Sequence, residues 1–300
     1  MFLLTFCGEN DILLKKQKGE KLMSKTQKID LFFSKHRHFS QALFPVLVSF
    51  LLTFSLLLVK QYLIFFILFC FMTLFLLLFV SVAPTRLSLQ GIQELSKGNP
   101  YPLLNITEAL LSFNLSESQK QAAIINHCEG LRYTGKYKEA YEHLNELNID
   151  KIPTAINTKI VYYANLSDLC SLLGKYDESI FYYKKVTTLF SDMKEGAVKR
   201  NIQNSYVLTF LDIQNCLITR RYDDVINLSA LFLANQGPQK RVSAITDVSL
   251  ACALAHFQKG EFSLAKNHLY GIIQNGCMLY AVTEAKNLLS TIESQENKQK

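Results

Sequence analysis

The side chains best suited to chemistry in this chain are its histidines and cysteines, and their spacing matches no catalytic or metal-binding motif. The six histidines and seven cysteines form no Cys-x-x-Cys pair and no His-Glu-x-x-His. A glycine-rich phosphate loop and a Gly-x-Ser-x-Gly turn are also missing from the sequence. His127 and His256 fall in helical stretches, where we interpret them as packed or half-exposed imidazoles. We therefore expect no enzymatic activity, no cofactor and no metal site.

The cysteines fit a different role, as small apolar side chains. Their number is odd, and those beyond residue 83 occur singly in apolar helical stretches. A free cysteine is among the most buried residue types, and disulfides are rare in reducing compartments. We interpret these cysteines as reduced and buried, which favours a reducing compartment.

The positive charge of the chain is concentrated near its N-terminus. The formal net charge is +7. Residues 1–82 carry nine Lys or Arg against four Asp or Glu, whereas residues 83–300 carry 23 against 21. A nucleic-acid-binding domain would instead carry its basic residues as a patch on the folded part. The distribution favours a role beside a membrane and predicts no nucleic-acid partner.

Two apolar runs follow the basic segment. Ala42–Val59 has 18 residues, Tyr62–Val82 has 21, and only Lys60 and Gln61 separate them. As helices they would extend roughly 27 and 31 Å, close to the thickness of about 30 Å of a hydrocarbon core. The pattern predicts two transmembrane helices within residues 42–82, with the lipid bilayer as a partner. In the alternative arrangement, only Tyr62–Val82 spans and the first run lies in the interface.

The basic segment, residues 1–41, predicts the orientation of this hairpin. Positive flanks stay in the cytoplasm, so two spans would return the chain to the same side. The expected localisation is a multi-pass cell-membrane protein whose C-terminal domain is cytoplasmic. In a bacterial gene, codons for Lys18-Gly19-Glu20 can contain a ribosome-binding sequence, and Met23 follows closely. Residues 1–22 would then be a mis-assigned upstream stretch.

The remainder of the chain has helical spacing and a repeated motif. The four copies are Gly135-Lys-Tyr137-Lys-Glu-Ala140, Gly174-Lys-Tyr176-Asp-Glu-Ser179, Arg220-Arg-Tyr222-Asp-Asp-Val225 and Gly260-Glu-Phe262-Ser-Leu-Ala265. The aromatic residue recurs after 39, 46 and 40 positions. A recurrence of about this length is typical of a solenoid built from helical hairpins.

Each motif position has a physical role in such a hairpin. The glycine allows a positive φ at the turn between antiparallel helices. The aromatic residue is expected to pack back onto the preceding helix, and the small residue lets the two helices approach closely. The residues that define the repeat are Gly135, Tyr137, Ala140, Gly174, Tyr176, Ser179, Tyr222, Gly260, Phe262 and Ala265.

The motif resembles the tetratricopeptide (TPR) repeat over roughly residues 121–275. The third copy departs from the pattern because Arg220 replaces glycine, and the spacing exceeds the family period of about 34 residues. The resemblance implies an all-α, TPR-like solenoid over residues 83–300. Another kind of helical-hairpin solenoid is the alternative fold.

By this resemblance, the first helix of each repeat lines a concave groove that binds peptides or partner proteins. The residues projected there are Asn126, Glu129, Arg132, Asn165, Asp168 and Gln214. The leading hypothesis is a membrane-anchored scaffold for an unknown protein or peptide. The alternatives are a peptide-sensing regulatory receptor and an assembly subunit of a membrane or envelope complex. A tight titration with short peptides would favour the receptor, and capture of a large stable partner would favour the scaffold.

Overall fold

The protein is all-helical wherever its structure is described. The computed structural model describes residues 47–48, 50–51, 63–147, 149–150, 154–203, 206–235 and 241–299. These residues form helices and turns, and no strand occurs among them. The all-α prediction is therefore confirmed. The predicted basic segment 1–41 and most of the first apolar run lie outside the described residues.

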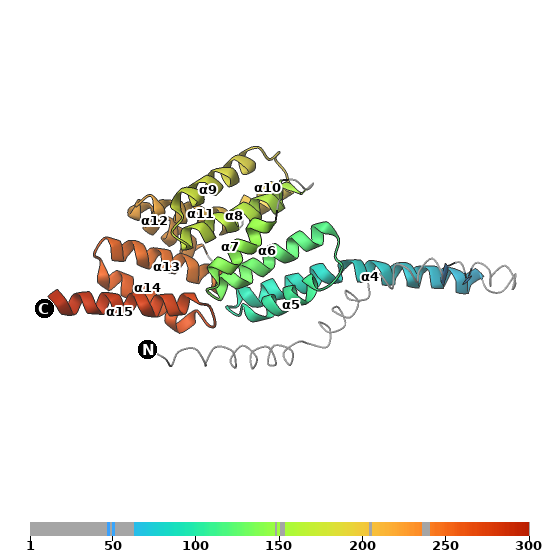
Figure 1. The fold of residues 1–300 in the computed structure, drawn as a ribbon, viewed down its shortest axis with the longest axis horizontal. Coiled ribbons are helices and arrows are strands. Elements are labelled where there is room, and N and C mark those ends of the chain that lie inside the picture. The colour runs from blue at the N-terminus through green and yellow to red at the C-terminus, as the bar shows by residue number, and fades with distance from the viewer. Residues whose placement is uncertain are drawn as a thin grey trace. The chain divides into compact units, whose positions relative to one another are not determined.

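Figure 1 shows the helices in chain order. They are α4 (Leu63–Ser96), α5 (Tyr101–Leu111), α6 (Glu117–Tyr133), α7 (Tyr137–Glu146), α8 (Ile156–Leu172), α9 (Tyr176–Ser191), α10 (Ala197–Gln203), α11 (Tyr206–Ile218), α12 (Tyr222–Ala234), α13 (Val242–Gln258), α14 (Phe262–Asn275) and α15 (Ala281–Gln299). From α7 onward, helices that follow one another in sequence also pack against one another, with the exception of the short α10 after α9. This succession of helical hairpins is consistent with a TPR-like solenoid.

The predicted transmembrane hairpin needs correction. In the part of the chain that the structure describes, none of the helices combines the length and the apolar character needed to cross a membrane. The second apolar run does not end as a span at Val82, because α4 continues through Pro84 to Ser96. Ala83 and Leu87 are fully buried, so this half of α4 belongs to a protein core. The predicted two-span membrane localisation is therefore wrong, and the bilayer is not supported as a partner.

The chain divides into two compact units. One consists of Met1–Gly91 and Asn105–Ala123, and the other of Ile92–Leu104 and Ile124–Lys300. In the first unit, a small core joins Leu87 of α4 to two leucines and an isoleucine of α5 and to Ala123 of α6. The second unit contains the four motif copies and several larger cores.

The hairpin α8–α9 illustrates how the helices meet in the second unit. Its crossing point is a pair of small residues, Ser167 and Ser179. The Ser167 hydroxyl donates to the Ser179 carbonyl at 2.9 Å, and the Ser179 hydroxyl donates to the Ser167 carbonyl at 2.7 Å. The two helices therefore approach closely, and both buried hydroxyl groups still form a hydrogen bond.

The four motif turns share one backbone structure. The turn residues Gly135, Gly174, Arg220 and Gly260 have φ values of 82°, 74°, 59° and 77°. In each copy, the next residue donates its N–H to the carbonyl five positions earlier, at 2.8 to 3.0 Å. This pairing ends a helix with a left-handed residue and satisfies one of its last carbonyls. Arg220 adopts that conformation although it carries a side chain.

Gly135 is required for space as well as for its φ. A Cβ atom at this position would lie 2.6 Å from the ring of Tyr280. At Gly174 and Gly260, the same added atom would meet nothing within 4 Å. The first motif turn therefore packs directly against the segment that precedes α15.

Candidate functional site

The second unit contains a cavity of about 600 Å³. It is lined by Arg132, Tyr133, Tyr137, Ser171, Leu172, Tyr176, Phe210, Gln214, Leu217, Ile218, Arg220, Tyr222, Asp247, Leu250, Ala251, Leu254, Gln258, Ala281 and Glu284. We call it the aromatic cavity, because tyrosine and phenylalanine rings form much of its wall. The lining combines aromatic and apolar residues with polar and charged ones, and ligand sites also combine an apolar surface with polar groups.

Three of the four motif aromatics face this cavity. Tyr137, Tyr176 and Tyr222 are the first residues of α7, α9 and α12 and belong to the cavity lining. Tyr176 is 54% exposed, so it does not pack fully onto the preceding helix as the motif predicts. The fourth, Phe262, begins α14 after the same kind of turn but packs against the core of α13, α14 and α15, so the turn alone does not place a ring in the cavity.

A group of hydrogen-bonded polar residues forms one end of the cavity. We call Arg132, Tyr133, Asp168, Gln214 and Asp247 the groove network. Arg132 forms ion pairs with Asp168 through its Nε and with Asp247 through its Nη1, the latter at 3.1 Å. The Tyr133 hydroxyl donates to Asp247 at 2.6 Å, and the Gln214 amide nitrogen donates to Asp168 at 2.6 Å. Side chains from α6, α8, α11 and α13 are thereby joined.

The groove network is buried and contains more acid than base. The side chains of Arg132, Asp168 and Asp247 are only 7–9% exposed. Burial raises the pKa of Asp247, although the Arg132 charge opposes that rise. Burial also raises the pKa of the nearby Glu129 to about 7, against the attraction of Arg132. A single guanidinium thus holds two carboxylates, and Glu129 lies near them with a raised pKa.

A second polar contact lies elsewhere on the cavity wall. The Tyr137 hydroxyl donates to the Glu284 carboxylate at 2.8 Å, which joins α7 to α15. Burial raises the pKa of Glu284, and this hydrogen bond counteracts part of the effect. The Tyr137 ring meets Tyr280 edge to face, with centroids 5.9 Å apart. Residues from both ends of the repeat region therefore meet at the wall of the aromatic cavity.

The structure brings five of the six predicted groove residues together. Arg132 and Gln214 line the aromatic cavity. Glu129, Asn165 and Asp168 line an adjoining cavity of about 30 Å³, to which Arg132 also belongs. Asn126 lines neither of these two cavities and is half-buried on α6. Arg132 and Asp168 form an ion pair with each other. Their charges therefore stabilise the packing of α6 against α8 and are not free for a binding partner.

Two buried amide atoms in these walls have no hydrogen-bond partner among the described residues. They are Oε1 of Gln214 and Nδ2 of Asn165. A buried polar atom without a partner costs roughly 1–3 kcal/mol. Both atoms are buried, so a ligand would reach them only if their side chains moved.

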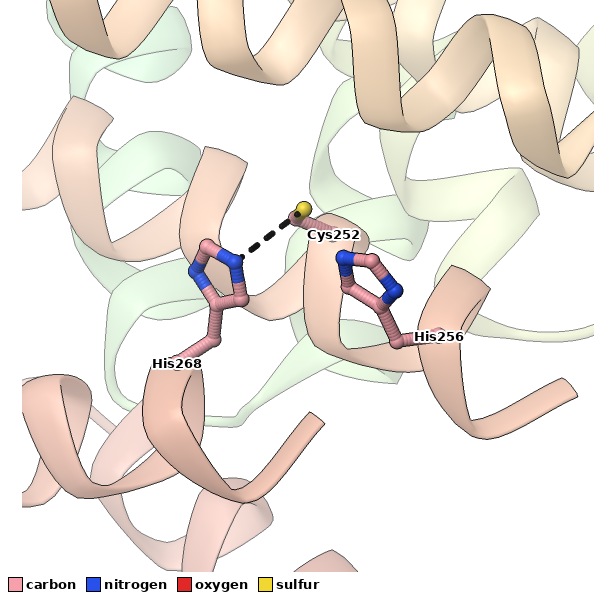
Figure 2. Close-up of side chains that lie close together, drawn as sticks. All are labelled: Cys252, His256 and His268. Carbon is pink, nitrogen blue, oxygen red and sulfur yellow. Dashed lines mark hydrogen bonds between the residues drawn. The ribbon is translucent and has the colours of Figure 1, made fainter. Parts of the chain in front are cut away.

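A different cluster of side chains lies between α13 and α14 (Figure 2). We call Cys252, His256 and His268 the Cys–His cluster; their potential ligand atoms all lie within 4.8 Å of one another. The Cys252 sulfur is 3.4 Å from Nε2 of His268. The two imidazoles are stacked, with centroids 5.7 Å apart. Burial raises the pKa of Cys252 to about 11. In the described residues this is the one group of three that can hold a metal ion.

The sequence reasoning missed Asp247, Glu284 and the Cys–His cluster. Asp247 and Glu284 come from helices far along the chain, and no local pattern connects them to Arg132. For the cluster a weak signal did exist. Cys252 and His256 are four residues apart, which places them on one helical face. His268 follows Gly260 by eight positions, on the helix that faces them.

Comparison with known proteins identifies a family. The family model described as the SusR N-terminal TPR domain matches residues 107–270. No curated protein and no solved structure matches the chain. The match covers all four motif copies and supports a role in protein–protein interaction.

Proposed function

The chain belongs to the family of the SusR N-terminal TPR domain, and on that premise we propose that it binds an extended peptide segment of a partner protein in the aromatic cavity. The peptide would place an apolar or aromatic side chain among the rings and would donate a backbone N–H to Gln214. The proposed function requires no catalytic step by the domain itself.

The observation that carries this proposal is the orientation of the Gln214 amide. Its nitrogen donates to Asp168, and a carboxylate can only accept. Its oxygen Oε1 must therefore be the free end, and that acceptor has no partner among the described residues. Because Oε1 is buried, the Gln214 side chain would have to turn toward the cavity to accept a peptide N–H, which an extended segment presents along its length.

The walls of the cavity support an apolar side chain in preference to a basic one. Leu250, Ala251 and Leu254 of α13 line one side, and Tyr176 and Phe210 belong to the same lining. The carboxylates are already engaged, since Asp247 accepts from Tyr133 and Glu284 accepts from Tyr137. Aromatic residues are also enriched among the residues that contribute most to binding energy.

We would test the proposal with a displayed library of random peptides, followed by fluorescence polarisation of the enriched sequences. Ser171 is half-buried and lines the cavity, so Ser171→Trp should fill its entrance. We expect enriched peptides to share an apolar residue, and we expect Ser171→Trp to weaken their binding at least about tenfold, or 1.4 kcal/mol.

The matched control is Thr187→Trp, which adds the same side chain at an exposed position on α9, away from the cavity. It should bind like the wild type. Equal binding by Ser171→Trp and the wild type, with both proteins folded, would contradict the assignment of the cavity. Short peptides that bind saturably would favour a peptide receptor, whereas a need for a folded partner would favour a scaffold.

A further inference from the structure

We propose that the Cys–His cluster is a binding site for one Zn²⁺ ion. Cys252 and His256 lie on α13, and His268 lies opposite them on α14 (Figure 2). The proposal is independent of peptide binding. At about 100° per residue, the cavity-lining positions of α13 lie on the opposite face of the helix from Cys252 and His256.

The distances within the cluster suit a tetrahedral ion. Zn²⁺ binds sulfur at about 2.3 Å and imidazole nitrogen at about 2.0 Å, which places a sulfur and a nitrogen ligand roughly 3.5 Å apart. The Cys252 sulfur and His268 Nε2 are 3.4 Å apart. With all potential ligand atoms within 4.8 Å of one another, small side-chain rotations would complete the arrangement.

Glu261 provides a second, independent observation. Its carboxylate lies 2.6 Å from Nδ1 of His256. In Figure 2 the other ring nitrogen of His256 is turned toward Cys252. Histidines that bind metals usually donate their second N–H to a carboxylate, which fixes the tautomer and makes the ligating nitrogen more basic. The structure already contains this arrangement with Nε2 of His256 as the ligand atom.

Glu261 is itself held in place by the motif turn. Its backbone N–H donates to the His256 carbonyl at 2.9 Å, directly after the left-handed Gly260. Lys259 contacts the same carboxylate at 2.9 Å. The turn therefore supplies a fixed acceptor for the ligating histidine.

The donor set selects the kind of metal. One thiolate and two imidazoles suit Zn²⁺, whereas Mg²⁺ and Ca²⁺ require oxygen ligands. Cys252 and His256 are 3% and 7% exposed, and His268 is half-buried. Entry would therefore occur on the His268 side. Three protein ligands leave one coordination position for water or another small ligand.

The first repeat offers an internal control. His127 and His143 also stack, with centroids 5.8 Å apart and an interplanar angle of 19°. His143 and His268 both follow their motif glycine by eight positions. The first pair nevertheless belongs to no group of three ligand atoms among the described residues. A stacked pair alone should not bind the ion.

The experiment is a titration of the reduced, full-length chain with Co²⁺ and then with Zn²⁺. We expect one Co²⁺ per chain, with the visible absorption of a tetrahedral site and a near-ultraviolet thiolate-to-cobalt band. Zn²⁺ should displace it. Cys252→Ala should lose the thiolate band, and Glu261→Gln should bind Zn²⁺ about 10- to 100-fold more weakly. His143→Ala should match the wild type.

Glu261→Gln changes a partly exposed side chain, so it keeps the test valid should Cys252→Ala fail to fold. The proposal would be overturned by an absence of stoichiometric binding to the wild type. It would equally be overturned by a thiolate band that persists in folded Cys252→Ala, or by unchanged affinity in Glu261→Gln.

Discussion

The groove network and the Cys–His cluster are both groups of buried polar side chains between packed helices. They differ in how strongly their polar atoms are already paired with one another. In the network, Arg132 forms an ion pair with Asp247, and the Tyr133 hydroxyl donates a hydrogen bond to the same carboxylate. In the cluster, ligand atoms converge on one another, and the contact between Cys252 and His268 is a weak sulfur–nitrogen one. The first arrangement stabilises the fold as it stands, whereas the second is suited to an added ligand. The following predictions separate these two roles.

The largest effect is expected from Arg132→Met. This change leaves Asp168 and Asp247 buried without their cation, and removal of one partner from a buried ion pair costs about 3–5 kcal/mol. Urea unfolding followed by circular dichroism would measure the loss. A loss below about 1 kcal/mol would show that the network does not stabilise the fold.

Zn²⁺ should produce the next effect, and only through the Cys–His cluster. At a free concentration about 100 times its Kd, a ligand that binds only the folded state adds about 2.7 kcal/mol to the free energy of unfolding. Urea unfolding of the reduced protein with and without Zn²⁺ measures this gain. Cys252→Ala should show no gain, and Arg132→Met should retain it if the variant is still folded.

Glu129 should make the groove network sensitive to pH. Its pKa is raised by burial from 4.5 to about 7, so the folded state binds a proton more tightly than the unfolded state. The resulting stability is complete below about pH 4.5 and is lost as the pH rises through 7. Glu129→Gln should equal the wild type near pH 4 and exceed it by about 1–3 kcal/mol at pH 8. Parallel stability curves for the two proteins would contradict this assignment.

The smallest effect is expected from Cys252→Ala in metal-free protein. The thiol then acts as a small apolar group, and its loss should cost about 1 kcal/mol. Thermal unfolding in the presence of a chelator would measure it. A cost similar to that of Arg132→Met would mean that the cluster is a structural core and not a ligand site.

Much of the fold could be predicted because its signals are local. The motif Gly-x-aromatic-x-x-small locates each turn, and the chemistry of the turn is contained within about six residues. Even the degenerate copy keeps the turn, since Arg220 adopts a φ of 59°. The candidate groove residues on first helices followed from the same register.

The contacts within the candidate site could not be predicted, because they join residues that are far apart in the sequence. Arg132 and Asp247 are 115 positions apart, and no spacing rule connects them. The membrane prediction relied on the hydropathy of residues 42–82 and on the basic residues that precede them. It could not anticipate that α4 continues into a protein core through Ala83 and Leu87.

The most direct test of the proposed function is methyl NMR of the domain as a selected peptide is added. Ala251, Leu254 and Ala281 line the aromatic cavity, whereas Ala265 and Ala285 lie in the core between α14 and α15. We predict that the peptide shifts the first three methyl signals and leaves the last two in place. Shifts confined to other methyl groups, with Ala251 and Leu254 unmoved, would contradict binding in this cavity.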